Sequence, residues 1–401
     1  MRLALLTDES LPKGRRAHAQ MIHQLAAEFE KNGHKSVVIT PGNPHQATAL
    51  IIDFVDGVEY WRFKSGYTRG VGNIRRLINE WLLSYRAWSA IADKVVNCRF
   101  DLCVNYSPTI FFGPLTRKLK RQGTFVYLIL RDMFPQWIID IGLISERSPA
   151  AFFLRYYESM NYRLADCIGV MSHANLKVFN KAHPSLTNVK ILMNWSSTAP
   201  FDLSKVKSDI RQKYKISEKV VFFYGGSLTT SNDMPNIMRL AKNLIKYKHV
   251  HFLILGEGDQ FDLINELAEL WNLNNVTILP SVSQIEYKMI LTQVDVGLFS
   301  LSIKYTDHNF PGKLLGYMVE SIPILGSANA GNDLMGLIND SNAGFVHING
   351  DDKALANSAI KLIEGQAKRS DCGKNARSLL EQYFSVEAAY AHILLESNLS
   401  N

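Results

Sequence analysis

The sequence predicts an α/β protein built of two Rossmann-like domains that face each other across a cleft. Short apolar runs alternate with longer helical patterns along almost the whole chain, which is typical of parallel sheets with crossover helices. With 401 residues the chain exceeds the length over which one core keeps growing, and its alternation loosens over residues 196–204. We therefore expect two similar domains joined there, with ligands bound at the carboxyl ends of the strands.

The expected elements follow in order along both domains. A helix over residues 17–31, ended by Asn32-Gly33, comes after the first strand. Strands are expected in the first domain at 3–6, 36–40, 60–63, 101–105, 125–130, 166–171 and 190–193, and in the second at 220–224, 251–255, 276–279, 296–299, 322–326 and 344–347. A last helical stretch over 386–395 either packs locally or crosses back to the first domain.

The charge is uneven between the two halves. Residues 1–200 contain 25 Lys/Arg and 15 Asp/Glu, whereas residues 201–401 contain 19 and 22, so the halves carry +10 and −3. The excess favours an anionic surface or ligand for the first half. No apolar run approaches the roughly 18 to 20 residues of a membrane span, and MRLALLTDES turns acidic before a signal-peptide core could form. We expect a cytoplasmic protein.

The most informative motif is Pro311-Gly312-Lys313, which opens a helix after an expected strand. Glycine would let a phosphate approach the backbone, and Lys313 adds a positive charge, so the motif predicts a diphosphate site that also includes Leu314. The alternative is a solvated lysine on an ordinary amphipathic helix. Two further glycine turns, at Gly226-Ser227 and at Gly256-Glu257-Gly258, follow strands and could bring backbone groups to a nucleotide, or could be plain turns.

In the first domain, the loop after the first strand should face the same cleft. Gly14 would give this loop its flexibility, and Arg15 could meet phosphate or be solvated; His18 is the one histidine expected near the cleft. Arg131-Asp132 follows the most apolar strand, where a charged pair is placed for catalysis or substrate orientation. A structural ion pair is the alternative.

Several motifs are absent. No Asp-x-Asp occurs, so the carboxylate pair that holds a divalent ion with a diphosphate is missing, and we expect no metal and no other cofactor. Asp351-Asp352 is better explained by helix capping. The absence of Gly-x-Ser-x-Gly, a Walker loop and His-Glu-x-x-His argues against hydrolase, P-loop and zincin functions.

The chain resembles the retaining glycosyltransferases of family 4, which have the GT-B fold. The resemblance runs from LLTDESLPKG and NGHKSVVIT, through LRDMFP and MSHANLKVF, to LGEGDQFDLINELAE, NNVTILPSV, PGKLLGYM, NAGNDL and NAGF. RDMFPQWIIDIGLI and PGKLLGYM are most similar to bacterial enzymes of O-antigen and capsule assembly, including N-acetyl-L-fucosamine transferases. The resemblance implies an acceptor-binding domain over 1–196, a nucleotide-sugar domain over 197–384, and a helix over 385–401 that crosses back to the first domain.

The resemblance also implies site residues. The base would lie beside Pro280, Ser281 and Val282, and the diphosphate beside Lys313, Gly226-Ser227 and the Gly14 loop. Where many members carry an Arg and a Lys, this chain has Ser227 and Asn232, which can still donate hydrogen bonds; where many carry two glutamates, it has His308 and Gly316. Glu320, one turn on, is a possible substitute.

The function implied is transfer of a sugar, expected to be an N-acetylated amino sugar, from a UDP-sugar to an undecaprenyl diphosphate-linked glycan. Lys313 would stabilise the leaving diphosphate, with Arg131 and Asp132 orienting the substrates. A helix over 70–96 with Trp81 and Trp88, and the basic cluster Arg117, Lys118, Lys120 and Arg121, suit an anionic inner-membrane surface; core packing of both tryptophans is the alternative. Nucleic acid is not an expected partner. A nucleotide-sugar 2-epimerase and a non-catalytic subunit of the same fold remain alternative functions.

Overall fold

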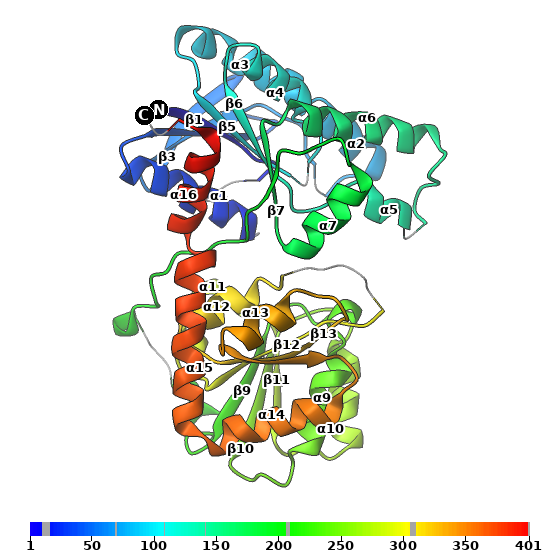
Figure 1. Ribbon diagram of the computed structural model, residues 1–401, viewed down its shortest axis with the longest axis vertical. Coiled ribbons are helices and arrows are strands. Elements are labelled where there is room, and N and C mark those ends of the chain that lie inside the picture. The colour runs from blue at the N-terminus through cyan, green and yellow to red at the C-terminus, as the bar shows by residue number, and fades with distance from the viewer. Residues whose placement is uncertain are drawn as a thin grey trace. The chain divides into compact units, whose positions relative to one another are not determined.

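The computed structural model describes residues 1–9, 17–68, 70–107, 109–140, 142–205, 209–304 and 310–399. The chain divides into two compact units (Figure 1). Unit 1 consists of Met1–Ser196 with Val386–Asn401, and unit 2 consists of Ser197–Ser385. Each unit is an α/β domain around its own sheet.

Unit 1 contains an eight-stranded sheet in the order β3-β4-β2-β1-β5-β6-β7-β8. Its strands are β1 (Arg2–Leu6), β2 (Lys35–Pro41), β3 (Leu50–Val55), β4 (Val58–Phe63), β5 (Leu102–Tyr106), β6 (Phe125–Ile129), β7 (Cys167–Val170) and β8 (Val189–Ile191). All run parallel except the edge strand β3, which the sequence pattern missed. It pairs antiparallel with β4 through a two-residue turn at Asp56 (φ 48°) and Gly57 (φ 86°).

The helices of unit 1 cover both faces of this sheet. They are α1 (Ala17–Lys31), α2 (Asn73–Trp81), α3 (Leu83–Asn97), α4 (Gly113–Lys120), α5 (Gln136–Asp140), α6 (Pro149–Leu164), α7 (His173–Ala182) and α16 (Val386–Ser397). The single helix expected over 70–96 is wrong, because the structure has two helices with Leu82 between them. The buried row of α3, spaced every four residues from Leu83 to Val95, begins where α2 with its exposed apolar residues ends.

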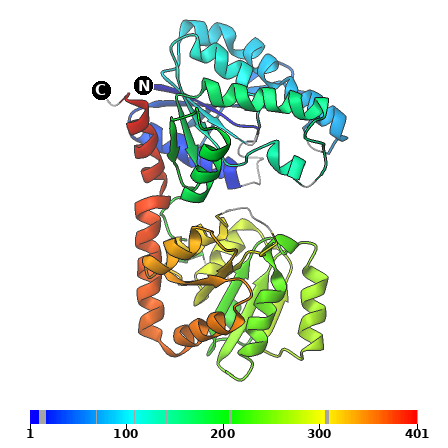
Figure 2. The same cartoon turned by 45° about the vertical axis from the view of Figure 1, so that its right-hand side comes forward.

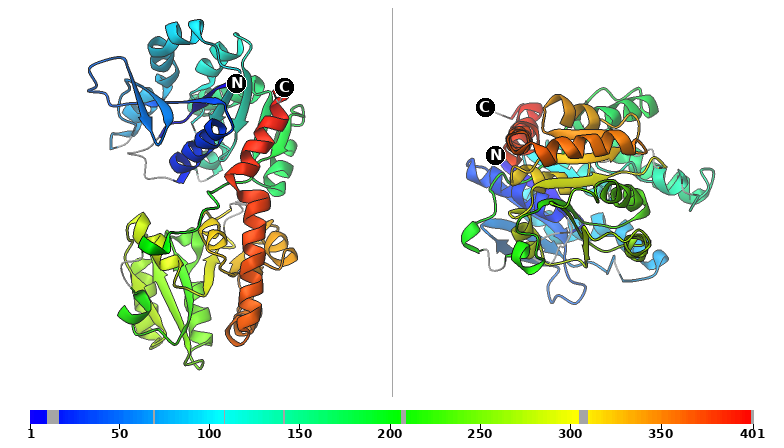
Figure 3. Two further views of the ribbon diagram at one scale, coloured as in Figure 1. Left: turned by 90° about the vertical axis from the view of Figure 1, so that its left-hand side faces the viewer. Right: turned by 90° about the horizontal axis from the view of Figure 1, so that it is seen from below.

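The last helix packs on the first one. Tyr390 of α16 meets Phe29 of α1 edge-on with ring centroids 4.8 Å apart, and its hydroxyl lies 3.2 Å from His34 Nε2. Ala389 and Ile393 are buried in the same core. In Figure 3 the red helix α16 lies beside the dark blue helix α1. The chain thus leaves unit 2 after α15 (Gln366–Leu379) and ends in unit 1, because α16 buries its apolar side chains there.

Unit 2 contains an all-parallel sheet in the order β11-β10-β9-β12-β13-β14, with helices on both faces (Figure 2). The strands are β9 (Val220–Gly225), β10 (Val250–Leu255), β11 (Val276–Leu279), β12 (Val296–Ser300), β13 (Ile324–Ala328) and β14 (Gly344–Ile348). Numbered from its own first strand, this is the 3-2-1-4-5-6 order of doubly wound folds. The order reverses between β9 and β12, which is where such folds bind ligands.

The helices of unit 2 begin with α8 (Ile210–Lys213) and α9 (Met234–Asn243). They continue with α10 (Phe261–Leu270), α11 (Gln284–Leu291), α12 (Lys313–Val319), α13 (Leu334–Asp340), α14 (Asp352–Glu364) and α15. The capping interpretation of Asp351 is confirmed, because its carboxylate accepts a hydrogen bond from Ala354 N–H at the start of α14.

Candidate functional site

The site forms at the reversal of strand order in unit 2. β9 ends at Gly225 and continues into Gly226-Ser227, while β12 leads through a loop to Pro311-Gly312 and the start of α12. Because both strands point their carboxyl ends to one edge, the glycine turn and Lys313 come together although they are far apart in sequence. His308, in the place of a family glutamate, lies outside the described residues.

Lys313 is the centre of this arrangement. Its Nζ lies 3.4 Å from the centroid of the Tyr224 ring, is buried, and has no hydrogen-bond partner among the described residues. Burial lowers the pKa of Lys313 well below its usual range. A solvated lysine is therefore not what the structure shows. The cation–π contact replaces only part of the hydration that the ammonium loses, so an anion beside it would be stabilised.

Gly226 lies directly beside this ammonium. A Cβ at Gly226 would lie 3.5 Å from Lys313 Nζ, and its φ of +133° favours glycine. Ser227 is exposed next to it, and among the described residues no group accepts a hydrogen bond from its N–H. Tyr224, which sequence reasoning missed, donates its hydroxyl to Ser227 O at 2.8 Å. An aromatic residue two positions before the glycine was the available signal.

The glycines of the next turn have a packing role. A Cβ on Gly256 would lie 1.8 Å from Gly226 O, and one on Gly258 would lie 2.2 Å from Leu228 O. Leu228 N–H donates to Glu257 O at 2.9 Å, so the two turns extend the pairing of β9 with β10. Both glycines are needed for this close approach, which then shapes the edge beside Lys313.

The remaining donor-site predictions in unit 2 fall at the same edge, except one. Asn232 braces the first turn, because its Nδ2 donates to Ser227 O and Thr229 Oγ1, each at 2.9 Å. Pro280, Ser281 and Val282 follow β11, and Ser281 Oγ donates to Glu257 Oε2 at 2.9 Å. Pro311 and Gly312 precede α12, in which Leu314 is buried.

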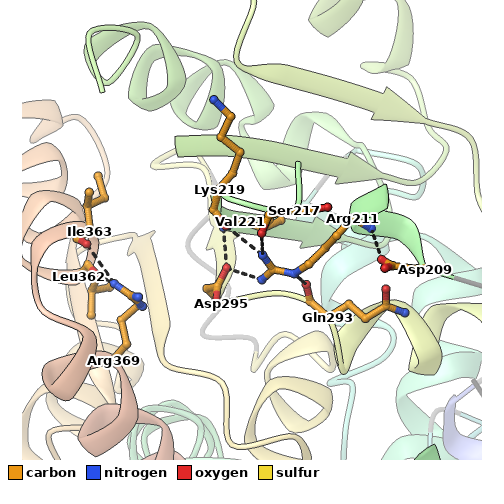
Figure 4. A network of polar contacts seen from close by, with 10 residues as sticks. All are labelled: Asp209, Arg211, Ser217, Lys219, Val221, Gln293, Asp295, Leu362, Ile363 and Arg369. Atoms are coloured by element: carbon orange, nitrogen blue, oxygen red, sulfur yellow. Dashed lines mark hydrogen bonds and ion pairs between the residues drawn. The ribbon is translucent and has the colours of Figure 1, made fainter. Parts of the chain in front are cut away.

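Glu320 is the exception, and its prediction needs correction. It lies at the end of α12, directly before β13 begins, and therefore at the amino edge of the sheet, opposite Lys313. Its carboxylate accepts a hydrogen bond from Phe201 N–H at 2.8 Å, and burial raises its pKa. This edge also holds the Arg211–Asp295 ion pair at 2.6 Å, with Asp295 accepting from Val221 N–H (Figure 4). Glu320 thus serves the packing of this edge.

Unit 1 has its own reversal of strand order, between β1 and β5. His18 stacks on Tyr106 with centroids 5.4 Å apart, and its Nε2 lies 3.4 Å from Asp8 Oδ1 and 3.9 Å from Glu9 Oε2. Gly14 and Arg15 lie outside the described residues. His18 is therefore at the carboxyl edge of this sheet, beside two carboxylates.

Arg131 is placed differently from its predicted partner Asp132. The guanidinium is buried, donates to Leu192 O at 2.6 Å and Met193 O at 3.2 Å, and lies over the Trp195 ring. Burial lowers its pKa. These contacts tie β6 to the chain after β8, whereas Asp132 is exposed. The structure thus gives Arg131 a structural role.

Comparison with known proteins defines the class. Residues 206–379 match the family model of the glycosyl transferases group 1. Among solved structures, sucrose-phosphate synthase from Thermosynechococcus elongatus has 15% identity and a TM-score of 0.69, covering 98% of this chain and 97% of its own. WaaG, named as a glycosyltransferase of lipopolysaccharide biosynthesis, has 14% identity and a TM-score of 0.63 over 98% and 99%. The protein thus has the GT-B fold, and its residues 206–379 match a glycosyltransferase family.

Two further similarities bear on the particular activity. HepE from Anabaena, solved with UDP-glucose, has 16% identity and a TM-score of 0.65 over 98% of both chains. The protein named "Probable glycosyltransferase WbjE" from Pseudomonas aeruginosa is 22% identical over 259 residues, which are 64% of this chain and 64% of that protein.

In the ranges that the structure describes, no helix is both long and apolar enough to cross a membrane. The same ranges contain no group of three His, Cys, Asp or Glu side chains that could hold a metal ion.

Proposed function

We propose that the protein transfers an N-acetylated amino sugar from a UDP-sugar to an undecaprenyl diphosphate-linked glycan during bacterial surface polysaccharide synthesis. The observation that carries the proposal is the buried ammonium of Lys313 at the reversal of strand order in unit 2, which has no hydrogen-bond partner among the described residues. A diphosphate would supply the negative charge that pairs with this ammonium. The UDP-glucose complex of HepE and the lipopolysaccharide role in the name of WaaG support the donor and the pathway class.

In the proposed reaction the bond between the sugar C1 and the β-phosphate oxygen breaks, and a bond from C1 to the acceptor oxygen forms. Negative charge then develops on the β-phosphate, and stabilising that charge in a dry site is usually the main catalytic contribution. Lys313 Nζ and the Ser227 N–H would supply the positive side of this interaction. The leaving phosphate accepts the acceptor's proton, which gives retention without a separate base and without metal.

The proposed acceptor places the protein at the cytoplasmic face of the inner membrane. Support comes from α2, where Ile74 is 79% and Ile78 49% exposed. Trp81, at the end of the same helix, is also exposed, and a hydrogen bond from its Nε1 to Tyr157 of α6 at 2.6 Å holds it in place. The basic cluster contributes less than its sequence suggests, because Lys120 pairs with Asp166 at 2.7 Å. Trp88 packs partly against the core, with Lys118 Nζ 5.1 Å from its ring.

Vesicle flotation tests this attachment. Anionic vesicles should bind the protein, and raised salt should weaken binding because charges are screened within about 10 Å at 0.1 M. The double variant Arg117→Glu, Arg121→Glu and the variant Ile74→Ser should each reduce binding, while Leu270→Ser, equally exposed on α10 of unit 2, should not. Binding that is indifferent to salt and to both changes in unit 1 would count against the membrane proposal.

A donor screen tests the transfer itself. UDP-sugars are incubated with a membrane extract as acceptor, UDP release is measured, and the anomeric configuration of the product is read by NMR. We expect release that depends on acceptor and is highest with an N-acetylated amino sugar. Epimerised free donor without acceptor would favour the epimerase, and UDP binding without any turnover would favour the non-catalytic subunit.

A further inference from the structure

Unit 1 contains a pocket whose lining residues do not include His18. It has a volume of about 560 Å³, within the range of small-molecule sites, and lies between the segment after β4, the loop after β2 and helix α3. β2 and β4 are parallel, so Pro41 and Phe63 end at the same carboxyl edge of the sheet. The pocket therefore occupies the edge at which α/β domains bind ligands.

The pocket is lined by two cations without a carboxylate. Lys64 and Arg86 both face it, and none of its described lining residues is acidic. Neither side chain forms an ion pair with a described residue. Burial lowers the pKa of Arg86, and an arginine nevertheless stays protonated. Its charge is thus partly desolvated and uncompensated.

Neutral groups hold Arg86 in place. Nη1 donates to Asn79 Oδ1 at 3.2 Å and to Ser65 Oγ at 3.5 Å, and both of these partners are buried. Asn79 is fixed in turn, because its Nδ2 donates to Tyr67 O at 2.8 Å. A Cβ on Gly66 would lie 2.2 Å from Asn79 Oδ1, so glycine is required for this packing. These contacts orient the guanidinium while leaving Nε and Nη2 without a described acceptor.

The loop after β2, which forms another wall of the pocket, is also held by hydrogen bonds. Gln46 is buried, and its Nε2 donates to Thr48 O and Arg62 O, each at 3.0 Å, which fixes the loop after β2. Tyr85, 59% exposed, presents a ring beside the cations, and Ser89 adds a hydroxyl one turn further along α3. An exposed ring next to a fixed arginine suits a ligand with an apolar face and a charged group.

We propose that this pocket binds an anionic sugar, whose phosphate or carboxylate is held by Arg86 and Lys64 and whose ring lies against Tyr85. The charged sugar could belong to the glycan acceptor or to a free sugar phosphate that acts on the enzyme. The binding site lies wholly in unit 1 and does not depend on the donor site proposed for unit 2.

Calorimetry on the full chain tests the site with three probes: glucose 6-phosphate, glucuronate and glucose. We expect the two charged probes to bind at about 1 mM or tighter, and glucose to bind roughly tenfold to a hundredfold more weakly. Arg86→Gln should abolish binding of the charged probes, and Arg86→Lys should retain part of it. Lys64→Gln, at an exposed position whose side chain has no hydrogen-bond or ion-pair partner among the described residues, should weaken it. Arg163→Gln, an exposed cation of α6 away from the pocket, should leave it unchanged.

Kinetics then separate the two sources. Competition between glucose 6-phosphate and the membrane acceptor would identify the pocket as part of the acceptor site. A changed rate at saturating acceptor would identify a free effector. The proposal is overturned if the charged probes do not bind, if glucose binds as tightly, or if binding survives both Arg86→Gln and Lys64→Gln. If the wild-type protein binds the charged probes but transfers no sugar, the result would count against the donor-site proposal alone.

Discussion

Replacing Lys313 by methionine should nearly abolish turnover while leaving the fold at least as stable. Methionine keeps most of the length of the side chain and its contact with Tyr224 but removes the ammonium. Removing one positioned donor to developing negative charge typically costs about 2.7 to 4 kcal/mol, or roughly a hundredfold to a thousandfold in rate. We expect a loss of that size in UDP release.

The stability change should have the opposite sign to an ordinary core mutation. The buried ammonium gains a cation–π contact worth about 2 kcal/mol, against a desolvation cost of several kcal/mol for an unpaired ion. Lys313→Met should therefore raise the free energy of unfolding by about 1 to 3 kcal/mol, and thermal unfolding without ligand measures it. UDP should raise the unfolding temperature of the wild type more than that of the variant.

A matched control separates charge from position. Lys353→Met removes an exposed lysine on α14 of the same unit. The activation free energy of turnover and the free energy of unfolding should both stay within about 0.5 kcal/mol of the wild-type values. Wild-type turnover in Lys313→Met would remove Lys313 from the catalytic site. A destabilised variant whose activity falls only with its folded fraction would instead make Lys313 a structural residue.

Four further predictions follow from the same site. The pKa of Lys313 is lower in the folded than in the unfolded chain, so the unfolded state binds more protons between the two pKa values. The free energy of unfolding without ligand should therefore rise with pH toward about 10.4, by about 1.4 kcal/mol per pH unit. Lys313→Met should lose this slope in denaturant titrations. Where the pH lies between the folded and the unfolded pKa of Lys313, UDP binding should take up a proton for the same reason, measured by calorimetry in buffers of different ionisation enthalpy. Activity should survive chelator, and an absolute need for magnesium would contradict the proposed charge stabilisation. Gly256→Ala should abolish UDP binding and lower the unfolding temperature, because its Cβ would lie 1.8 Å from Gly226 O.

The strands were predictable because their apolar runs are local. The six strands of unit 2 occur within two residues of the predicted ranges, since the four central strands are buried along almost their whole length and read as largely apolar runs. β3 was missed although Leu50–Val55 is apolar and Asp56-Gly57 is a strong hairpin signal. An expectation of purely parallel sheets left no place for an antiparallel edge strand.

The chemistry of the site was less accessible, because it depends on which strands are neighbours. Lys313 was placed at a carboxyl edge from its position after a strand, but its contact with Tyr224 requires β9 beside β12. No local pattern encodes that pairing. The position of Glu320, in contrast, can be read from the local pattern. An expected strand begins directly after it, so Glu320 lies at the amino end of that strand, and the seven-residue helix before it spans about 10 Å. The sequence alone could have placed Glu320 at the wrong edge for a donor.

Buried cations in this protein differ in how their hydrogen-bonding groups are used. Arg131 and Lys313 both follow strands of a sheet, and burial lowers the pKa of both. Two nitrogens of Arg131 donate hydrogen bonds to backbone carbonyl oxygens, and these bonds hold β6 to the chain after β8. Lys313 has an aromatic ring and an open glycine beside it but no acceptor among the described residues. A fold that buries a cation without an acceptor loses stability in the empty state, and an anionic ligand is what recovers it.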